Sequence, residues 1–130
     1  MTTEQLHQAF LNTSYKVMAK TEFTIKIDII IPEVKDLNSW AFITAWNPSP
    51  EILNLEENRI RNKNLEEDII KVGLKYYNGL GISEDEQWSE ESFFIENISQ
   101  DKANEWAAKY KQLAYVFGYK NEKANLIYTK

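Results

Sequence analysis

The stretch Trp40–Pro48, with the sequence WAFITAWNP, is the feature that most constrains the fold. It is an almost unbroken run of apolar and β-prone residues, and a strand that is apolar on both faces needs cover on both faces, so we expect it inside a sheet. Pro48 cannot donate a ladder hydrogen bond, and it biases Asn47 away from the helical region. We therefore predict a strand over Trp40–Trp46 that leaves Thr44 and Asn47 near its carboxyl end, where α/β sheets tend to place ligands.

Periodicity along the rest of the chain predicts three helices. The first covers residues 3–19, the second runs from Ser49-Pro50-Glu51 to about Val72, and the third begins after the capping residue Ser99. The second helix carries an apolar stripe of Leu65, Ile69 and Val72 that extends backwards to Arg61 and Asn58. The remaining apolar runs predict further strands at 23–31, 74–77, 92–96, 113–119 and 124–128, with a turn at 78–81 and an acidic loop at 83–87.

These elements follow the order α-β-β-α-β-β-α-β-β and predict one domain over residues 1–130. Its fold class is α+β, or alternatively α/β, with a mixed sheet of about five or six strands packed with three helices. The short connection between strand 23–31 and the central strand favours antiparallel pairing of these two neighbours.

Composition excludes several classes of protein. The chain of 130 residues contains no Cys, which excludes a disulfide framework, a thiolate metal site and a Cys nucleophile. Its net charge of −5 argues against a nucleic-acid or anionic-membrane surface. No signal peptide and no apolar stretch of ~18 residues is evident, so we expect a cytoplasmic protein.

Metal and cofactor motifs are missing from the sequence. His7 is the single His, which argues against a catalytic triad or a His-based metal site. The acidic run Glu84-Asp85-Glu86 lacks the spacing of a calcium loop, and the glycines near position 80 fit neither phosphate-loop pattern. We expect no cofactor and no metal, and the oligomeric state stays open.

Several local motifs occur together in a characteristic order. They are Ile43-Thr-Ala-Trp-Asn-Pro48, Glu57-Asn58, the glycines 79 and 81, Trp88-Ser-Glu-Glu-Ser92 and Tyr110-Lys-Gln-Leu-Ala114. In this order the chain resembles the bacterial domain-of-unknown-function family numbered 3293, over roughly residues 40–118. The resemblance implies a compact, stand-alone bacterial domain. It implies no activity and no catalytic residues.

Polar residues near the end of the central strand form a candidate ligand-binding site. Its members are Thr44, Trp46, Asn47, Asn58, Arg61, Trp88, Glu90, Glu91 and Gln112. Asn58 continues the apolar stripe of its helix, so it is expected to be partly buried and to need hydrogen-bond partners. Arg61, one turn further on, is positioned to pair with Glu90 or Glu91. The cluster is either a pocket for a small polar ligand or a structural network that ties down the turn.

Three functions fit this sequence. The first is a binding module for a small polar ligand or a protein partner near the end of the central strand. The second is an enzyme that uses Glu90 or Glu91 with amide donors; adjacent strand residues point to opposite faces, so the two carboxylates cannot face one substrate atom together. The third is an acidic inhibitor of the immunity-protein type. We favour the binding module, because the sequence lacks most ordinary catalytic equipment.

Overall fold

The computed structural model describes residues 2–130 of the chain, and its centre is a seven-stranded antiparallel sheet. In space the strands follow the order β2-β1-β4-β5-β3-β6-β7. They are β1 (Ser14–Val17), β2 (Phe23–Ile25), β3 (Ser39–Ile43), β4 (Tyr76–Ile82), β5 (Ser89–Glu96), β6 (Ala114–Tyr119) and β7 (Asn125–Tyr128). The predicted α+β class is confirmed. The prediction of a mixed sheet with five or six strands is wrong, because every strand pair is antiparallel and one further strand is present.

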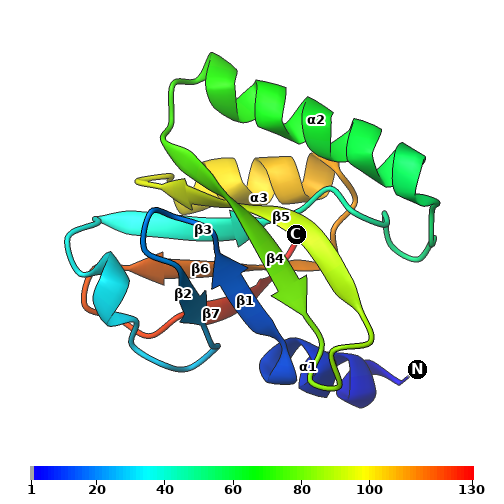
Figure 1. The fold of residues 1–130 in the computed structure, drawn as a ribbon, viewed down its shortest axis with the longest axis horizontal. Coiled ribbons are helices and arrows are strands. Elements are labelled where there is room, and N and C mark those ends of the chain that lie inside the picture. Colours follow the sequence, from blue (N-terminus) through cyan, green and yellow to red (C-terminus); the bar gives the residue numbers. More distant parts are fainter. Residues whose placement is uncertain (1) are drawn as a thin grey trace.

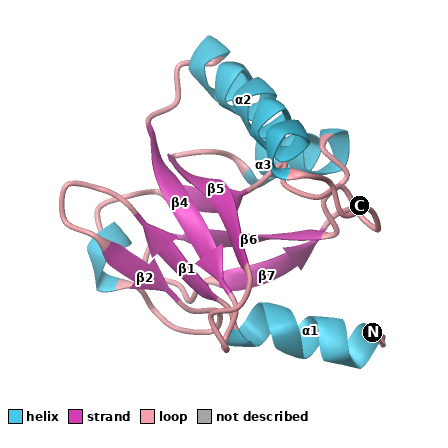
Figure 2. Cartoon of the chain, turned by 45° about the vertical axis from the view of Figure 1, so that its right-hand side comes forward, coloured by secondary structure: helices cyan, strands magenta, loops and turns pink. Residues whose placement is uncertain are grey.

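Three α-helices occur in the described part of the chain: α1 (Thr3–Asn12), α2 (Leu55–Lys71) and α3 (Gln100–Lys109). Each begins at a capping side chain, since Thr2, Asn54 and Ser99 each accept a hydrogen bond from a backbone N–H in the first turn. Helices α2 and α3 lie together over one face of the sheet, and α1 lies at the far end of the molecule from α2 (Figure 1, Figure 2). No helix within residues 2–130 is long and apolar enough to cross a membrane.

Strand β3 lies between β5 and β6, as expected for a strand that is apolar on both faces. Ala41 and Ile43 belong to the core beneath the two covering helices, which we call the helix-covered face. Leu65 and Ile69 of α2 and the apolar residues of α3 complete that core. Trp40 and Phe42 point to the opposite side, which we call the inner face.

The inner face is enclosed mainly by the curl of the sheet itself. The segment after β2 meets the hairpin β6–β7, where the N–H of Asp28 donates to the carbonyl of Ala124 at 2.8 Å. The N–H of Ala124 donates in return to the carbonyl of Ile29 at 3.0 Å, and an isolated bridge joins Ile30 to Lys123. The two sides of the sheet therefore come together, and the inner core is shielded without a covering helix pair.

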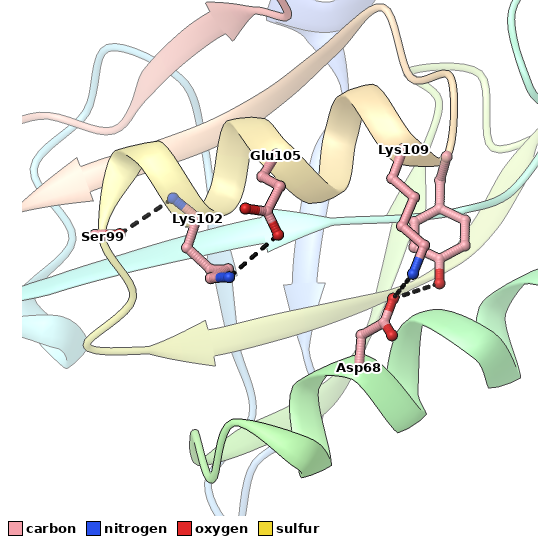
Figure 3. A network of polar contacts seen from close by, with 6 residues as sticks. Asp68, Ser99, Lys102, Glu105 and Lys109 are labelled. Atoms are coloured by element: carbon pink, nitrogen blue, oxygen red, sulfur yellow. Dashed lines mark hydrogen bonds and ion pairs between the residues drawn. The ribbon is translucent and has the colours of Figure 1, made fainter.

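A polar contact fixes α2 against α3. One carboxylate oxygen of Asp68 on α2 accepts from the Tyr110 hydroxyl at 2.5 Å and from the Lys109 ammonium at 2.9 Å (Figure 3). Asp68 is largely shielded, with 19% of its side chain exposed. Because both helices cover the same core, this contact fixes their relative position over β3.

Two predicted elements at the start of the chain are wrong. The predicted helix over 3–19 ends at Asn12, and Ser14–Val17 forms β1 instead, because Tyr15 and Val17 alternate as buried positions with Ser14 and Lys16. The predicted strand 23–31 shortens to β2. It pairs with β1 rather than with β3, whose partners are β5 and β6.

Two further boundaries differ from prediction. Helix α2 begins after Asn54 rather than at Ser49, and its stripe ends at Ile69, since Val72 is exposed. The predicted turn at 78–81 belongs to β4, where a Cβ on Gly79 would lie 2.5 Å from the Phe42 ring. Because Gly79 has no side chain, the Phe42 ring fits against it on the inner face, so the glycine serves packing rather than a turn.

Candidate functional site

Where the backbone hydrogen bonds of β3 stop, hydrogen bonds from side chains hold the chain in place. Asn62 of α2 accepts from the N–H of Ala45 at 2.8 Å and donates to the carbonyl of Glu91 at 2.7 Å. The Thr44 hydroxyl donates to the same carbonyl at 2.7 Å and accepts from the N–H of Trp46 at 3.0 Å. The end of β3 is thereby held to both β5 and α2.

Asn47 and Asn58 form the second half of this polar cluster. Asn47 has a φ of 47°, a left-handed conformation that Asn tolerates better than most residues. Its N–H donates to Asn58 Oδ1 at 2.7 Å, and its own Oδ1 accepts from Asn58 Nδ2 at 2.8 Å and from the N–H of Leu53 at 2.9 Å. The side-chain amides of Asn47 and Asn58 therefore hold the segment from Asn47 to Leu53 in a loop. Because this segment is a loop, α2 begins only after Asn54.

Arg61 and Gln112 connect the cluster to the end of α3. Arg61 Nε donates to the carbonyl of Ala45 at 2.7 Å, and its Nη2 donates to the carbonyl of Tyr110. Gln112 Nε2 donates to the carbonyls of Trp46 at 3.0 Å and Tyr110 at 3.2 Å. Both side chains satisfy carbonyls that the strand end and the helix end leave without a regular partner.

The structure thus brings together five of the predicted residues: Thr44, Asn47, Asn58, Arg61 and Gln112. We call these five residues and Asn62 the amide cluster. Sequence reasoning missed Asn62, although its spacing of four residues from Asn58 places both on the buried stripe of α2. The prediction that Arg61 pairs with Glu90 or Glu91 is wrong. The neighbouring Arg59 pairs with Glu91 at 3.1 Å on the surface, because Arg61 points inward to backbone carbonyls.

Glu90 and Glu91 point to opposite faces of β5. Glu91 lies toward α2, whereas Glu90 shares the inner face with Phe94. Burial raises the pKa of the Glu90 carboxyl from its usual value to about 7, and the Trp88 indole N–H offsets part of that rise. Trp88 therefore lies with Glu90 and apart from the amide cluster, while Trp46 is buried beside the cluster.

Tyr15 is the neighbour of Glu90 across the sheet. Register places Tyr15 opposite Gly81, and Gly81 opposite Glu90. Because Gly81 has no side chain, the ring of Tyr15 and the carboxyl of Glu90 share one space on the inner face. The Tyr15 hydroxyl itself donates to the carbonyl of Phe10 at 2.9 Å, so it anchors the end of α1.

A groove of about 700 Å³ lies between α3 and the hairpin β6–β7, and none of the predicted site residues lines it. Polar side chains from the start of α3 form one wall, and tyrosines of β6 form the floor. They include Ser99, Gln100, Asp101, Glu105, Tyr115 and Tyr119. The available sequence signal was the polar pattern of α3 combined with the alternation that puts Tyr115 and Tyr119 on one face of β6.

One residue that lines this groove, Tyr115, has a buried hydroxyl that makes no hydrogen bond within the described part of the chain. Its side chain is 4% exposed, yet its hydroxyl has no hydrogen-bond partner among residues 2–130. Burial raises the pKa of that hydroxyl, so it stays protonated and able to donate. The Gln100 side chain lies near enough to the Tyr115 hydroxyl to offset part of that rise in pKa, while its Oε1 accepts a hydrogen bond from the Tyr119 hydroxyl at 3.3 Å. Buried hydroxyls are normally satisfied, so the Tyr115 hydroxyl is an exception in the lining of the groove.

His7 contacts Tyr128, with 2.6 Å between its Nδ1 and the phenol oxygen, so the single imidazole joins α1 to β7. Within residues 2–130, His, Asp and Glu side chains form no group of three arranged to hold a metal ion.

Comparison with known proteins gives one match. Searches of curated proteins and of solved structures returned no match. The profile of the family described as "Protein of unknown function (DUF3293)" matches residues 43–115, from the end of β3 to the start of β6. This span contains the whole amide cluster, Glu90 and all of α3. Because the match covers more than half of the chain, the protein belongs to the DUF3293 family, and the predicted resemblance is confirmed.

Proposed function

We propose that this protein is a binding module for a small polar ligand, and that the groove between α3 and β6–β7 is its binding site. The observation that carries the proposal is Tyr115, which lines the groove and whose buried hydroxyl makes no hydrogen bond to a protein group within residues 2–130. An unsatisfied buried polar group costs about 1–3 kcal/mol. A ligand atom that pairs with this hydroxyl recovers that free energy on binding.

In this proposal the amide cluster positions the groove. Arg61 and Gln112 hold the carbonyl of Tyr110, directly after α3. Asp68 holds the Tyr110 hydroxyl from α2. The last turn of α3 is thus fixed from two directions, which holds the helix at a constant distance from β6. A preformed site of this kind loses less conformational entropy when it binds.

The test is a screen of nucleotides, amino acids, sugars and amines against ¹⁵N-labelled protein, with amide shifts as the readout. We expect hits to move the amides of 99–105 and 115–119. Tyr115→Phe is the decisive variant, because it should raise the free energy of unfolding by removing the unsatisfied hydroxyl, and at the same time weaken binding. A Tyr115→Phe variant that is less stable than wild type, or hits that map only to the end of β3, would contradict the proposal.

The environment of Glu90 favours a second candidate function, an enzyme that uses this carboxyl as a general acid or base. Its pKa of about 7 suits proton transfer near neutral pH. If this function holds, a substrate binds beside Glu90 on the inner face, so Glu90→Gln abolishes its turnover and leaves ligand binding in the groove unchanged. Turnover that survives Glu90→Gln would exclude it.

A further inference from the structure

We infer that the groove between α3 and β6–β7 recognises a ligand through a primary ammonium group. This inference rests on the proposed binding function and adds the chemical class of the ligand. It is carried by the juxtaposition of two carboxylates, a buried hydroxyl and an aromatic ring along one side of α3.

The charges that line the groove favour a cation. Asp101 and Glu105 stand four residues apart and so lie on the same side of α3, one turn from each other. Lys130 is the one cationic side chain in the lining. Glu105 pairs with Lys102 at 3.1 Å (Figure 3). Asp101 takes part in no ion pair among residues 2–130, so its carboxylate is open to a cationic ligand.

The floor of the groove offers the other contacts that an ammonium group needs. Asp101 and Tyr115 both line the groove. Burial is the main cause of the raised pKa of the Tyr115 hydroxyl; the Gln100 side chain opposes the rise, and the negative charge of Asp101 adds to it. An ammonium nitrogen has three N–H donors, which the Asp101 carboxylate and the lone pairs of the Tyr115 hydroxyl can accept. Tyr119 adds an exposed ring on the same floor, and aromatic rings attract cations.

Two lysines of α3 show the same combination of contacts, an ammonium group that meets both a carboxylate and an aromatic ring. Lys102 Nζ lies 5.7 Å from the ring centre of Trp106 while it pairs with Glu105. Lys109 Nζ lies 5.4 Å from the ring centre of Tyr110 while it pairs with Asp68. Each ammonium thus sits between a carboxylate and an aromatic ring, which is the arrangement that Asp101 and the two tyrosines offer to a ligand.

The opposing inference is an anionic ligand at the N-terminus of α3, where helix dipoles favour negative charge. One of the free N–H groups of the first turn is already taken, since the Ser99 hydroxyl accepts from Lys102 N–H. Asp101 brings a negative charge to the same turn. A second anion would meet that charge directly, so the cation is favoured.

The experiment compares three probes of similar length: 1,4-diaminobutane, 1,4-butanediol and succinate. Amide shifts of the ¹⁵N-labelled full chain locate each one, and titration gives its affinity. We expect the diamine to move the amides of 99–105 and 115–119 and to bind at least about tenfold more tightly than the diol, a difference of about 1.4 kcal/mol. Asp101→Asn should weaken diamine binding by about fivefold, as the loss of one exposed charge pair would.

The matched control is Asp36→Asn, which removes one exposed carboxylate outside the groove and should leave diamine binding unchanged. Equal binding of diol and diamine in the groove, or tighter binding of succinate there, overturns the ammonium inference and leaves the binding module standing. An equal loss of affinity in both variants also overturns it, because the attraction would then be nonspecific. If none of the probes reaches the groove, the ammonium inference fails, and the broad screen decides the proposed function separately.

Discussion

Asn47 and Asn58 hydrogen-bond each other twice, once through the backbone N–H of Asn47 at 2.7 Å and once between their side-chain amides at 2.8 Å. Asn58 is 2% exposed, so this exchange takes place inside the protein. The connection from β3 to α2 is therefore held by side-chain amides in place of a backbone ladder.

Replacement of Asn58 by Ala should destabilise the fold. The change leaves the buried N–H and Oδ1 of Asn47 short of partners, which is expected to lower the free energy of unfolding by about 1–3 kcal/mol. Asn58→Asp is the matched variant, because it keeps the shape and the acceptor but loses the donor to Asn47 Oδ1 and to the carbonyl of Leu53. Urea unfolding measures both. Wild-type stability in Asn58→Ala would show that these bonds contribute nothing.

Gly79→Ala should also destabilise the protein, because the new Cβ would lie 2.5 Å from the Phe42 ring on the inner face. Overpacking of this kind costs about 1–3 kcal/mol. Gly81→Ala, two residues further along β4, is the control: its Cβ would meet nothing nearer than 3.9 Å. Thermal unfolding should separate the two variants clearly. Equal midpoints would mean that Phe42 moves aside without cost.

Stability should fall as the pH rises from about 4.5 to 7. Burial raises the folded-state pKa of Glu90 to about 7, so over this range the folded state binds more protons than the unfolded state. The resulting loss, on the order of 2–3 kcal/mol, is complete above pH 7. Glu90→Gln should therefore be more stable than wild type at pH 8 and similar to it at pH 4. Parallel stability curves for the two proteins across this range would contradict the raised pKa.

Asp68 should act in the opposite direction and at lower pH. Burial alone would raise its pKa, but hydrogen bonds from Tyr110 and Lys109 outweigh burial and hold the pKa below its usual range. Its contribution is therefore present above the unfolded-state pKa and lost as the pH falls through the folded-state value. We expect Asp68→Asn to lower the free energy of unfolding at pH 7 by about 1 kcal/mol, with the difference vanishing in acid.

The matched control for that measurement is Glu67→Gln, since Glu67 is the exposed neighbour of Asp68 on α2. It removes the same charge without touching Tyr110. A loss of stability in Glu67→Gln as large as in Asp68→Asn would assign the effect to net charge rather than to the contact between helices.

The sequence predicted which residues are buried wherever a single hydrophobic pattern was present. The two-faced apolar run at Trp40 predicted a central strand, and the stripe through Leu65 and Ile69 predicted the buried side of α2. Strand β1 was missed because Ser14 and Val17 continue the helical spacing of Leu6 and Phe10, which hides the alternation of Tyr15 and Val17 with Lys16. Only the pairing with β2 and β4 decides between the two patterns, and sequence periodicity does not contain that pairing.

The candidate site could be predicted only where local sequence patterns fix the positions of its residues. Asn47 and Asn58 could be placed together because a proline and an apolar stripe fixed their positions. The groove could not, since it forms where α3 crosses β6 and depends on the separation of two elements rather than on either one. Glycine at position 79 was read as a turn, because nothing local shows that a ring from β3 passes over it.

The bonds between Asp28, Ile29 and Ala124 join parts of the chain that are about ninety-five residues apart in sequence. During synthesis the edge of the sheet at β2 therefore stays uncovered until the ribosome has released Ala124. Contacts of such high sequence separation slow folding and leave partly folded chains open to association. We expect this protein to complete its fold only after most of it has been translated, with the β2 edge as the part most dependent on chaperones until then.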